Sequence, residues 1–169
     1  KRNGEFTVNI ALIERGRPVL GVVYAPAFAR LFAGAHAGAF ELHWPVARMP
    51  GARIDLAEAT SIAARHAPDH RVGLWSRTHD THRNEEYRNL YGIEAVRTLG
   101  SSLKFCLIAA GEADLYPRHG PTMEWDTAAG QAVLEAAGGS VRDLFGAPLA
   151  YGKRADGFRN PSFVARGRS

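Results

Sequence analysis

Apolar and polar residues alternate along the first forty positions of the chain, with the period of two that is typical of half-buried strands. The alternation predicts a strand over 6–13, and an apolar run predicts a second, central strand over 19–24. A turn at 15–18 joins them, and 31–40 reads as a third strand with a glycine-bearing turn at 34–38. Three strands joined by short turns predict an antiparallel meander.

The pattern changes after a proline-punctuated stretch, in which 55–65 has helical periodicity with Asp55 as its cap. From residue 71 onward strands and helices alternate. The predicted strands are 72–75, 93–98, 113–116 and 141–144, and the predicted helices are 81–91, 101–110 and 127–137. Alternation of this kind indicates an α/β layer. We therefore expect an α/β fold (α+β layered) with a meander sheet in residues 1–70 and an alternating strand/helix sheet in residues 71–169.

Asp126 stands directly before the helix predicted over 127–137, whose apolar positions are mostly alanine and which ends at the glycines 138–139. So many alanines predict that this helix lies very close to its neighbour. An Asp at this place caps a helix, because its carboxylate accepts backbone N–H bonds and meets the positive end of the helix dipole. It also suits a hard cation such as Mg²⁺, which takes carboxylate and phosphate oxygens. The pattern leaves both roles open.

Composition narrows the class of protein. The chain has 169 residues, 46% of them hydrophobic and 22% charged, as in ordinary globular proteins. No run approaches the ~18 apolar residues of a membrane span, and the start lacks a signal-peptide core, so we expect a cytoplasmic protein. The net charge of +4 comes from scattered Lys and Arg. We therefore expect a small polyanionic substrate rather than nucleic acid.

Four residues at the junctions of predicted elements carry candidate chemistry. Ser101 opens a helix after a strand, where free N–H groups suit a phosphate, and Lys104 follows within one turn. Arg118 follows a strand, and Arg binds phosphate through two parallel bonds. His79 lies in the loop after the strand 72–75. Each has an ordinary alternative: a plain Ser cap, a solvated Lys, a surface Arg or an exposed His.

Four motifs in order resemble the inositol monophosphatase superfamily, and within it the bacterial 3′(2′),5′-bisphosphate nucleotidase branch. They are residues 1–10 (KRNGEFTVNI), 100–106 (GSSLKFC), 114–118 (DLYPR) and 125–130 (WDTAAG). The resemblance covers nearly the whole chain and is weakest over 41–68. Four motifs in the right order are far more specific than any one of them.

The resemblance implies an inositol monophosphatase-like fold and a Mg²⁺-dependent phosphatase. Its implied reaction is hydrolysis of the 3′-phosphate of 3′-phosphoadenosine 5′-phosphate to AMP and phosphate, a step of sulfur assimilation. Carried over by motif, His79, Ser101, Lys104 and Arg118 contact the phosphorylated nucleotide, and Asp126 binds metal beside it. Peripheral association with the inner membrane is a further partner expectation. Two alternatives stay open: an inositol monophosphatase- or fructose-1,6-bisphosphatase-type enzyme, and a non-catalytic nucleotide-binding module.

The chain departs from the family pattern in one respect. The family's Asp-Pro-Leu-Asp-Gly-Thr motif and upstream Glu, which hold most of the metal ions, are not in the sequence. We therefore expect an N-terminally truncated chain, the C-terminal two-thirds of such an enzyme, whose water-activating residues lie upstream. One carboxylate holds Mg²⁺ weakly, so the 169-residue chain alone is predicted to lack phosphatase activity.

Overall fold

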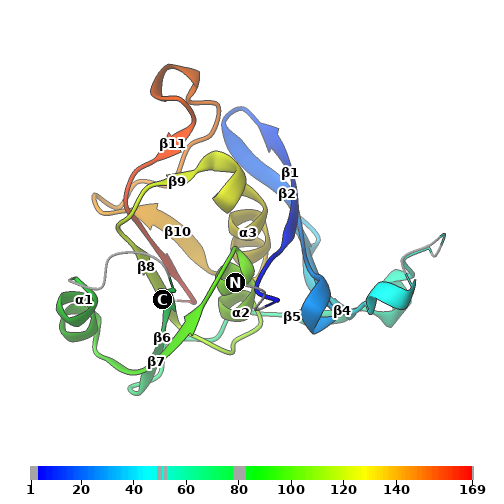
Figure 1. The fold of residues 1–169 in the computed structure, drawn as a ribbon, viewed down its shortest axis with the longest axis horizontal. Helices are drawn as coiled ribbons and strands as arrows, with labels where there is room; N and C mark the ends of the chain where they lie inside the picture. The colour runs from blue at the N-terminus through cyan, green and yellow to red at the C-terminus, as the bar shows by residue number, and fades with distance from the viewer. Residues whose placement is uncertain (1–3, 49–50, 52, 78–82, 169) are drawn as a thin grey trace.

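Two five-stranded sheets face each other across a pair of helices (Figure 1). The computed structural model describes residues 4–48, 51, 53–77 and 83–168. The first sheet is antiparallel and keeps the order of the chain. Its strands are β1 (Val8–Glu14), β2 (Arg17–Ala25), β3 (Arg30–Ala35), β4 (Gly38–His43) and β5 (Thr60–Ile62). The predicted meander is confirmed, with two strands more than expected.

Both differences from the predicted meander arise in its second half. The segment 31–40 is a hairpin of two strands, because the chain reverses between the paired residues Ala35 and Gly38, where Gly38 has a φ of 120°. The helix predicted over 55–65 is wrong. Asp55 does cap a turn, accepting the Ala57 N–H at 2.9 Å, but this turn is a single 3-10 turn (Leu56–Glu58). The β-branched residues after it pair with β4 instead.

The second sheet is mixed and has the strand order β10-β12-β8-β6-β7. Its strands are β6 (Arg71–Ser76), β7 (Ile93–Leu99), β8 (Leu115–Arg118), β10 (Ser140–Asp143) and β12 (Phe163–Arg166). β7 and β8 lie parallel to β6, whereas β12 is antiparallel to both of its neighbours. The sequence patterns predicted four of these strands and missed β12, as well as the small ribbon of β9 (Thr122–Met123) and β11 (Arg159–Asn160).

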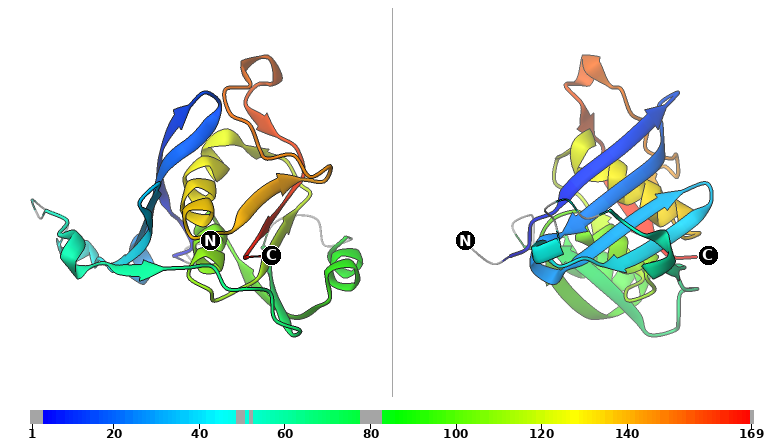
Figure 2. Two further views of the ribbon diagram at one scale, coloured as in Figure 1. Left: turned by 180° about the vertical axis from the view of Figure 1, so that it is seen from behind. Right: turned by 90° about the vertical axis from the view of Figure 1, so that its right-hand side faces the viewer.

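Helices α2 (Leu103–Ala109) and α3 (Glu124–Ala136) lie between the sheets, and α1 (Asn84–Tyr91) covers the far face of the second sheet (Figures 1 and 2). Further 3-10 turns span Pro26–Phe28, Val46–Arg48 and Arg154–Asp156. As the alanines predicted, α3 packs very closely on the first sheet. A Cβ at Gly21 would lie 2.2 Å from the Ala129 oxygen, and one at Gly34 would lie 2.5 Å from the Val133 Cα. Both positions on the sheet therefore require glycine.

One continuous apolar core joins the two sheets through these helices. It contains Phe32 from the first sheet, Phe105 and Val133 from the helices, and Leu74 and Phe163 from the second sheet. The layered α/β fold class is confirmed. Both sheets contribute to this shared core. The division of the chain into domains at residue 70 stays a prediction.

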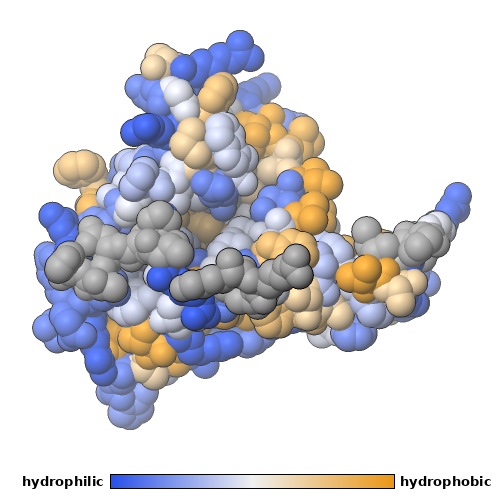
Figure 3. Space-filling model, viewed as in Figure 1, coloured by the Kyte–Doolittle hydropathy of each residue, from blue (hydrophilic) through white to orange (hydrophobic). Residues whose placement is uncertain are grey.

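The side chains of strand β1 alternate between an outer and an inner face. Val8, Ile10 and Leu12 are half exposed or more on the outer face, where Figure 3 shows apolar atoms over β1 and β2. Asn9 lies on the inner face and is less exposed. Ala11 follows Asn9 on this inner face and packs against the core, whereas Asn9 reaches Ser102, just before α2. Among the described residues, no helix combines the length and the apolar character needed to cross a bilayer.

Candidate functional site

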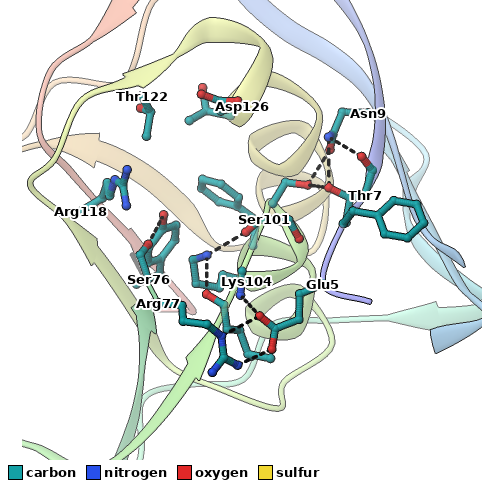
Figure 4. A pocket seen from close by; sticks show the side chains of 17 residues that line it. Glu5, Thr7, Asn9, Ser76, Arg77, Ser101, Lys104, Arg118, Thr122 and Asp126 are labelled. Atoms are coloured by element: carbon teal, nitrogen blue, oxygen red, sulfur yellow. Dashed lines mark hydrogen bonds and ion pairs between the residues drawn. The ribbon is translucent and has the colours of Figure 1, made fainter. Parts of the chain in front are cut away.

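A cavity of about 440 Å³ opens at the start of α2. Its other walls are the ends of β6 and β8, the start of α3, and residues 5–9, which we call the arm. Four of the five residues predicted to form the site line it: Ser101, Lys104, Arg118 and Asp126 (Figure 4). His79, the fifth, lies outside the described residues. The sequence separates Ser101 from Asp126 by 25 positions, and the fold brings them to one cavity.

The 100–102 turn forms the wall of the cavity before α2. Ser101 has a φ of 56°, in the left-handed region that non-glycine residues rarely adopt. The helix therefore begins at Leu103, two residues later than predicted, and it has only seven residues. The predicted start of the helix at Ser101 is thus wrong, while a phosphate near this helix start stays a prediction. The side chains of Lys104 and Arg118 place further charges in the same cavity.

Lys104 points into the cavity wall and is 2% exposed. Its Nζ donates to the Ser101 carbonyl at 2.8 Å and the Leu99 carbonyl at 3.1 Å, and it lies 4.7 Å from the centre of the Tyr116 ring. An ammonium has three N–H donors, so these bonds engage two of them. Burial, with the positive charge of Arg118, lowers the pKa of Lys104 to about 7. Lys104 thus lines the cavity and also stabilises the 100–102 turn through its two hydrogen bonds.

Arg118 ends β8 and is 6% exposed. Its Nε donates to the Gly120 carbonyl at 3.1 Å and its Nη2 to the Pro121 carbonyl at 3.2 Å. These bonds fix the plane of the guanidinium at the cavity wall. Since a guanidinium has five N–H donors, the side chain is held in place and still presents donors to a ligand.

Asp126 lies in the first turn of α3 and is exposed at the opposite side of the cavity from Glu5 (Figure 4). Its predicted place as the N-cap is wrong, because α3 begins at Glu124 and Met123 precedes it in extended conformation. The side chain nevertheless acts on the helix start: Oδ2 accepts the Met123 N–H at 2.8 Å. One carboxylate oxygen thus serves the helix, and the group as a whole faces the cavity.

The remaining acids nearby are committed to other partners. Glu5, also on the cavity wall, accepts the Gly100 N–H at 2.9 Å and forms an ion pair with Arg77. Asp114 is buried in a two-bond pair with Arg65, and Glu124 accepts the N–H groups of residues 152 and 153. Among the described residues, no three His, Cys, Asp or Glu side chains form a cluster that could hold a metal.

The described residues therefore do not form a complete Mg²⁺ site. Mg²⁺ requires near-octahedral oxygen coordination and gives up its water reluctantly. Asp126 is the acid placed to contribute one ligand from this part of the chain.

The cavity also contains residues that the sequence patterns did not single out. Glu5, Thr7 and Asn9 line it from the arm, Arg77 from the loop after β6, and Thr122 from β9. The signal for the first three was present in the sequence, as polar side chains at every second position before and within the first strand. The partner of that polar face, at residues 100–102, is visible only in the fold.

Comparisons with known proteins agree with this architecture. The model of the inositol monophosphatase family matches residues 1–162. The 3′(2′),5′-bisphosphate nucleotidase CysQ of Escherichia coli (strain K12) is 46% identical over 163 residues, which are 96% of this chain and 61% of that protein. The crystal structure of CysQ from Bacteroides thetaiotaomicron has a TM-score of 0.86 and 38% identity, over 99% of this chain and 65% of that one.

A more distant solved structure has the same fold. Inositol monophosphatase from Anabaena (Nostoc) sp. PCC 7120 has a TM-score of 0.69 and 26% identity, over 96% of this chain and 59% of that one. The chain thus spans about 61% of the length of the first curated relatives that it matches. Since the family model covers nearly all of its residues, the chain belongs to the inositol monophosphatase family.

Proposed function

We propose that this protein is a Mg²⁺-dependent 3′(2′),5′-bisphosphate nucleotidase. The reaction adds water to 3′-phosphoadenosine 5′-phosphate, breaks the bond to the 3′-phosphorus and gives AMP and phosphate, as part of sulfur assimilation. One observation carries the proposal: two buried cations, Lys104 and Arg118, and one exposed carboxylate, Asp126, line a single cavity. This charge pattern suits a phosphate ester that binds together with a metal ion.

The cationic side of the cavity suits a substrate with two phosphates. Arg118 has donors available for paired bonds to phosphate oxygens, which are among the strongest hydrogen bonds in proteins. Lys104 adds a compact charge, and Ser101 adds a hydroxyl group. A polyol monophosphate has one phosphate and would contact fewer of these groups. We therefore propose a nucleotidase rather than an inositol monophosphatase-type enzyme.

Asp126 is proposed as one ligand of the catalytic metal. A bound Mg²⁺ stabilises charge on phosphate oxygens and lowers the pKa of its water. No step of the reaction is assigned to the described residues alone, because they do not complete a metal site. The described residues contribute two groups that bind the substrate, Lys104 and Arg118, and one carboxylate across the cavity, Asp126.

The test is a comparison of phosphate release from 3′-phosphoadenosine 5′-phosphate, inositol 1-phosphate and fructose 1,6-bisphosphate, using the protein as its gene encodes it. We expect the highest kcat/KM for the nucleotide and no turnover after Mg²⁺ is removed with EDTA. A preference for inositol 1-phosphate would make the protein an inositol monophosphatase. Tight nucleotide binding in calorimetry without turnover at any Mg²⁺ concentration would make it a nucleotide-binding module.

A further inference from the structure

We propose that Glu5, Thr7 and Asn9, which we call the clasp, position the 100–102 turn so that Ser101 faces the substrate. The clasp belongs to the opening motif of the sequence, for which the proposed function has no other use. The role given to Ser101 rests on that proposed function, whereas the clasp itself is a feature of the fold.

The clasp arises from the alternation of a strand. Side chains two residues apart point to the same side of an extended chain. Glu5, Thr7 and Asn9 are half-buried, whereas the neighbouring Phe6 and Val8 are exposed. The three polar side chains therefore form one row, and Figure 4 shows this row beside the start of α2.

Thr7, Asn9 and Ser102 close a ring of hydrogen bonds. The Ser102 hydroxyl donates to the Asn9 Oδ1 at 2.5 Å, and the Asn9 Nδ2 donates to the Thr7 Oγ1 at 3.2 Å. The two hydroxyl oxygens of Thr7 and Ser102 lie 2.8 Å apart. Each hydroxyl has one proton, and that of Ser102 is already used, so Thr7 is the donor to Ser102. Every bond of the ring supports the next.

Glu5 holds the turn at its first residue. The Gly100 N–H donates to Glu5 Oε2 at 2.9 Å, and Arg77 keeps this carboxylate in place through its Nε at 3.0 Å. A Cβ at Gly100 would lie 3.1 Å from three atoms of Glu5, one of them in the backbone, so Glu5 packs closely against the backbone of Gly100. The bond from Arg77 is the largest influence that lowers the pKa of Glu5.

Lys104 holds the same turn from the other side. It donates to the carbonyl groups of Leu99 and Ser101, while the clasp takes the Gly100 N–H and the Ser102 hydroxyl. Together these bonds maintain the left-handed backbone of Ser101, which is unfavourable for a residue with a Cβ. Ser102 is thereby committed to the fold. The Ser101 hydroxyl has only a marginal contact with the Leu103 N–H, at 3.5 Å.

The consequence is a division of labour between two adjacent serines. Ser101 binds the substrate, and Ser102 is a positioning residue. The clasp residues are also positioning residues, because they act through the turn. Their loss should raise KM through displacement of Ser101 and Lys104, with a smaller effect on kcat.

Hydrogen exchange of the Gly100 amide tests the clasp without any ligand. We expect Thr7→Val and Ser102→Ala each to speed this exchange about tenfold, and the double variant to exchange no faster than either single one, because each breaks the same ring. Thr7→Ser, which keeps the hydroxyl, should restore protection. Thr60→Val, at an exposed threonine of β5, is the matched control. Unchanged exchange in Ser102→Ala, or additive effects in the double variant, would overturn the ring.

Nucleotide binding then tests the division between the serines. With 3′-phosphoadenosine 5′-phosphate in calorimetry, we expect Ser101→Ala to weaken binding about fivefold and leave Gly100 exchange unchanged, and Ser102→Ala to change both. The reverse pattern would overturn the assignment. If wild-type protein binds no nucleotide, the proposed function fails, and the exchange data still decide the clasp. Should Thr7→Val not fold, Ser102→Ala removes the same ring from the side of α2.

Discussion

The two sides of the cavity are built differently. On one side, Lys104, Arg118 and the 100–102 turn form a cationic wall, in which backbone carbonyls, the arm and Arg77 fix each group. On the other side, Asp126 is exposed, and within the described part of the chain its carboxylate accepts one hydrogen bond, from the Met123 N–H. Hydrogen bonds within the chain thus hold the cationic wall in a geometry that can accept an anion.

This difference separates binding from reaction. A preorganised cationic wall lowers the ordering cost of binding a phosphate. Among the described residues, the Asp126 carboxylate has fewer contacts, and its proposed contribution is to bind a metal ion beside the substrate. Substitutions on the two sides should therefore affect different quantities: affinity on the cationic wall and turnover at Asp126.

The largest effect is expected for Asp126→Asn. We expect a loss of kcat of about 100-fold or more, equivalent to ~2.7 kcal/mol in the barrier, because Asn is a weaker ligand for a hard cation. The melting temperature should stay near that of wild type, since the Asn oxygen can still accept the Met123 N–H.

Asp143→Asn is the matched control, since Asp143 also accepts backbone N–H groups and lies outside the cavity. Wild-type kcat together with wild-type melting temperature in Asp126→Asn would reduce Asp126 to a structural residue and leave the acidic side without a role.

The second effect in size is expected for Arg118→Ala. Loss of a charge-assisted contact should weaken nucleotide binding by about 1.5–3 kcal/mol, or roughly 10- to 150-fold. Arg118→Lys should recover little, because Lys cannot reproduce paired bonds. Arg142→Ala, which removes an exposed arginine bonded to a surface loop, is the control. An unchanged Kd in Arg118→Ala, measured by calorimetry, would remove Arg118 from the cationic wall.

Local patterns predicted the parts of this cavity that depend on sequence neighbours. Alternation predicted β1, an apolar run predicted β2, and the alanine run predicted the close packing of α3. The motifs then selected Ser101, Lys104, Arg118 and Asp126, which the fold brings together. Their roles as ligand contacts, the cytoplasmic location and the peripheral membrane association stay predictions.

The missed features all depend on distant partners. The segment 60–62 has helical periodicity, yet pairing with β4 makes it a strand. β12 is held between β8 and β10, neither of which adjoins it in the sequence. The ring that joins Thr7 and Asn9 to Ser102 spans more than ninety positions. The periodicity of one segment carries no information about a contact with a distant segment. The sequence therefore showed that polar residues alternate in the arm, but not that they contact Ser102.

The smallest effect, and the one that best separates the two sides, is the pH dependence of Lys104. Its pKa is lowered to about 7 by burial and by Arg118, so the ammonium loses its proton above that pH. Between about pH 7 and 9 a phosphate monoester is already mostly a dianion. The lowered pKa of Glu5 and the raised pKa of Tyr116 keep both groups from titrating there. We therefore expect nucleotide affinity to fall about three- to tenfold from pH 7 to 8.5, with uptake of a proton on binding at pH 8.

Stability should change in the opposite direction. An unfolded lysine has a pKa of about 10.4, so between about pH 7 and 10 the unfolded chain binds more protons at this position than the folded chain does. The free energy of unfolding then rises with pH across this window, because the folded state no longer buries a charge. Lys104→Met should remove both the fall in affinity and this rise in stability, and leave the effect of Asp126→Asn on kcat intact. Calorimetry in buffers of different ionisation enthalpy and urea unfolding at each pH measure the two slopes. Slopes of the same sign in wild type, or slopes that persist in Lys104→Met, would show that another group titrates in the cationic wall.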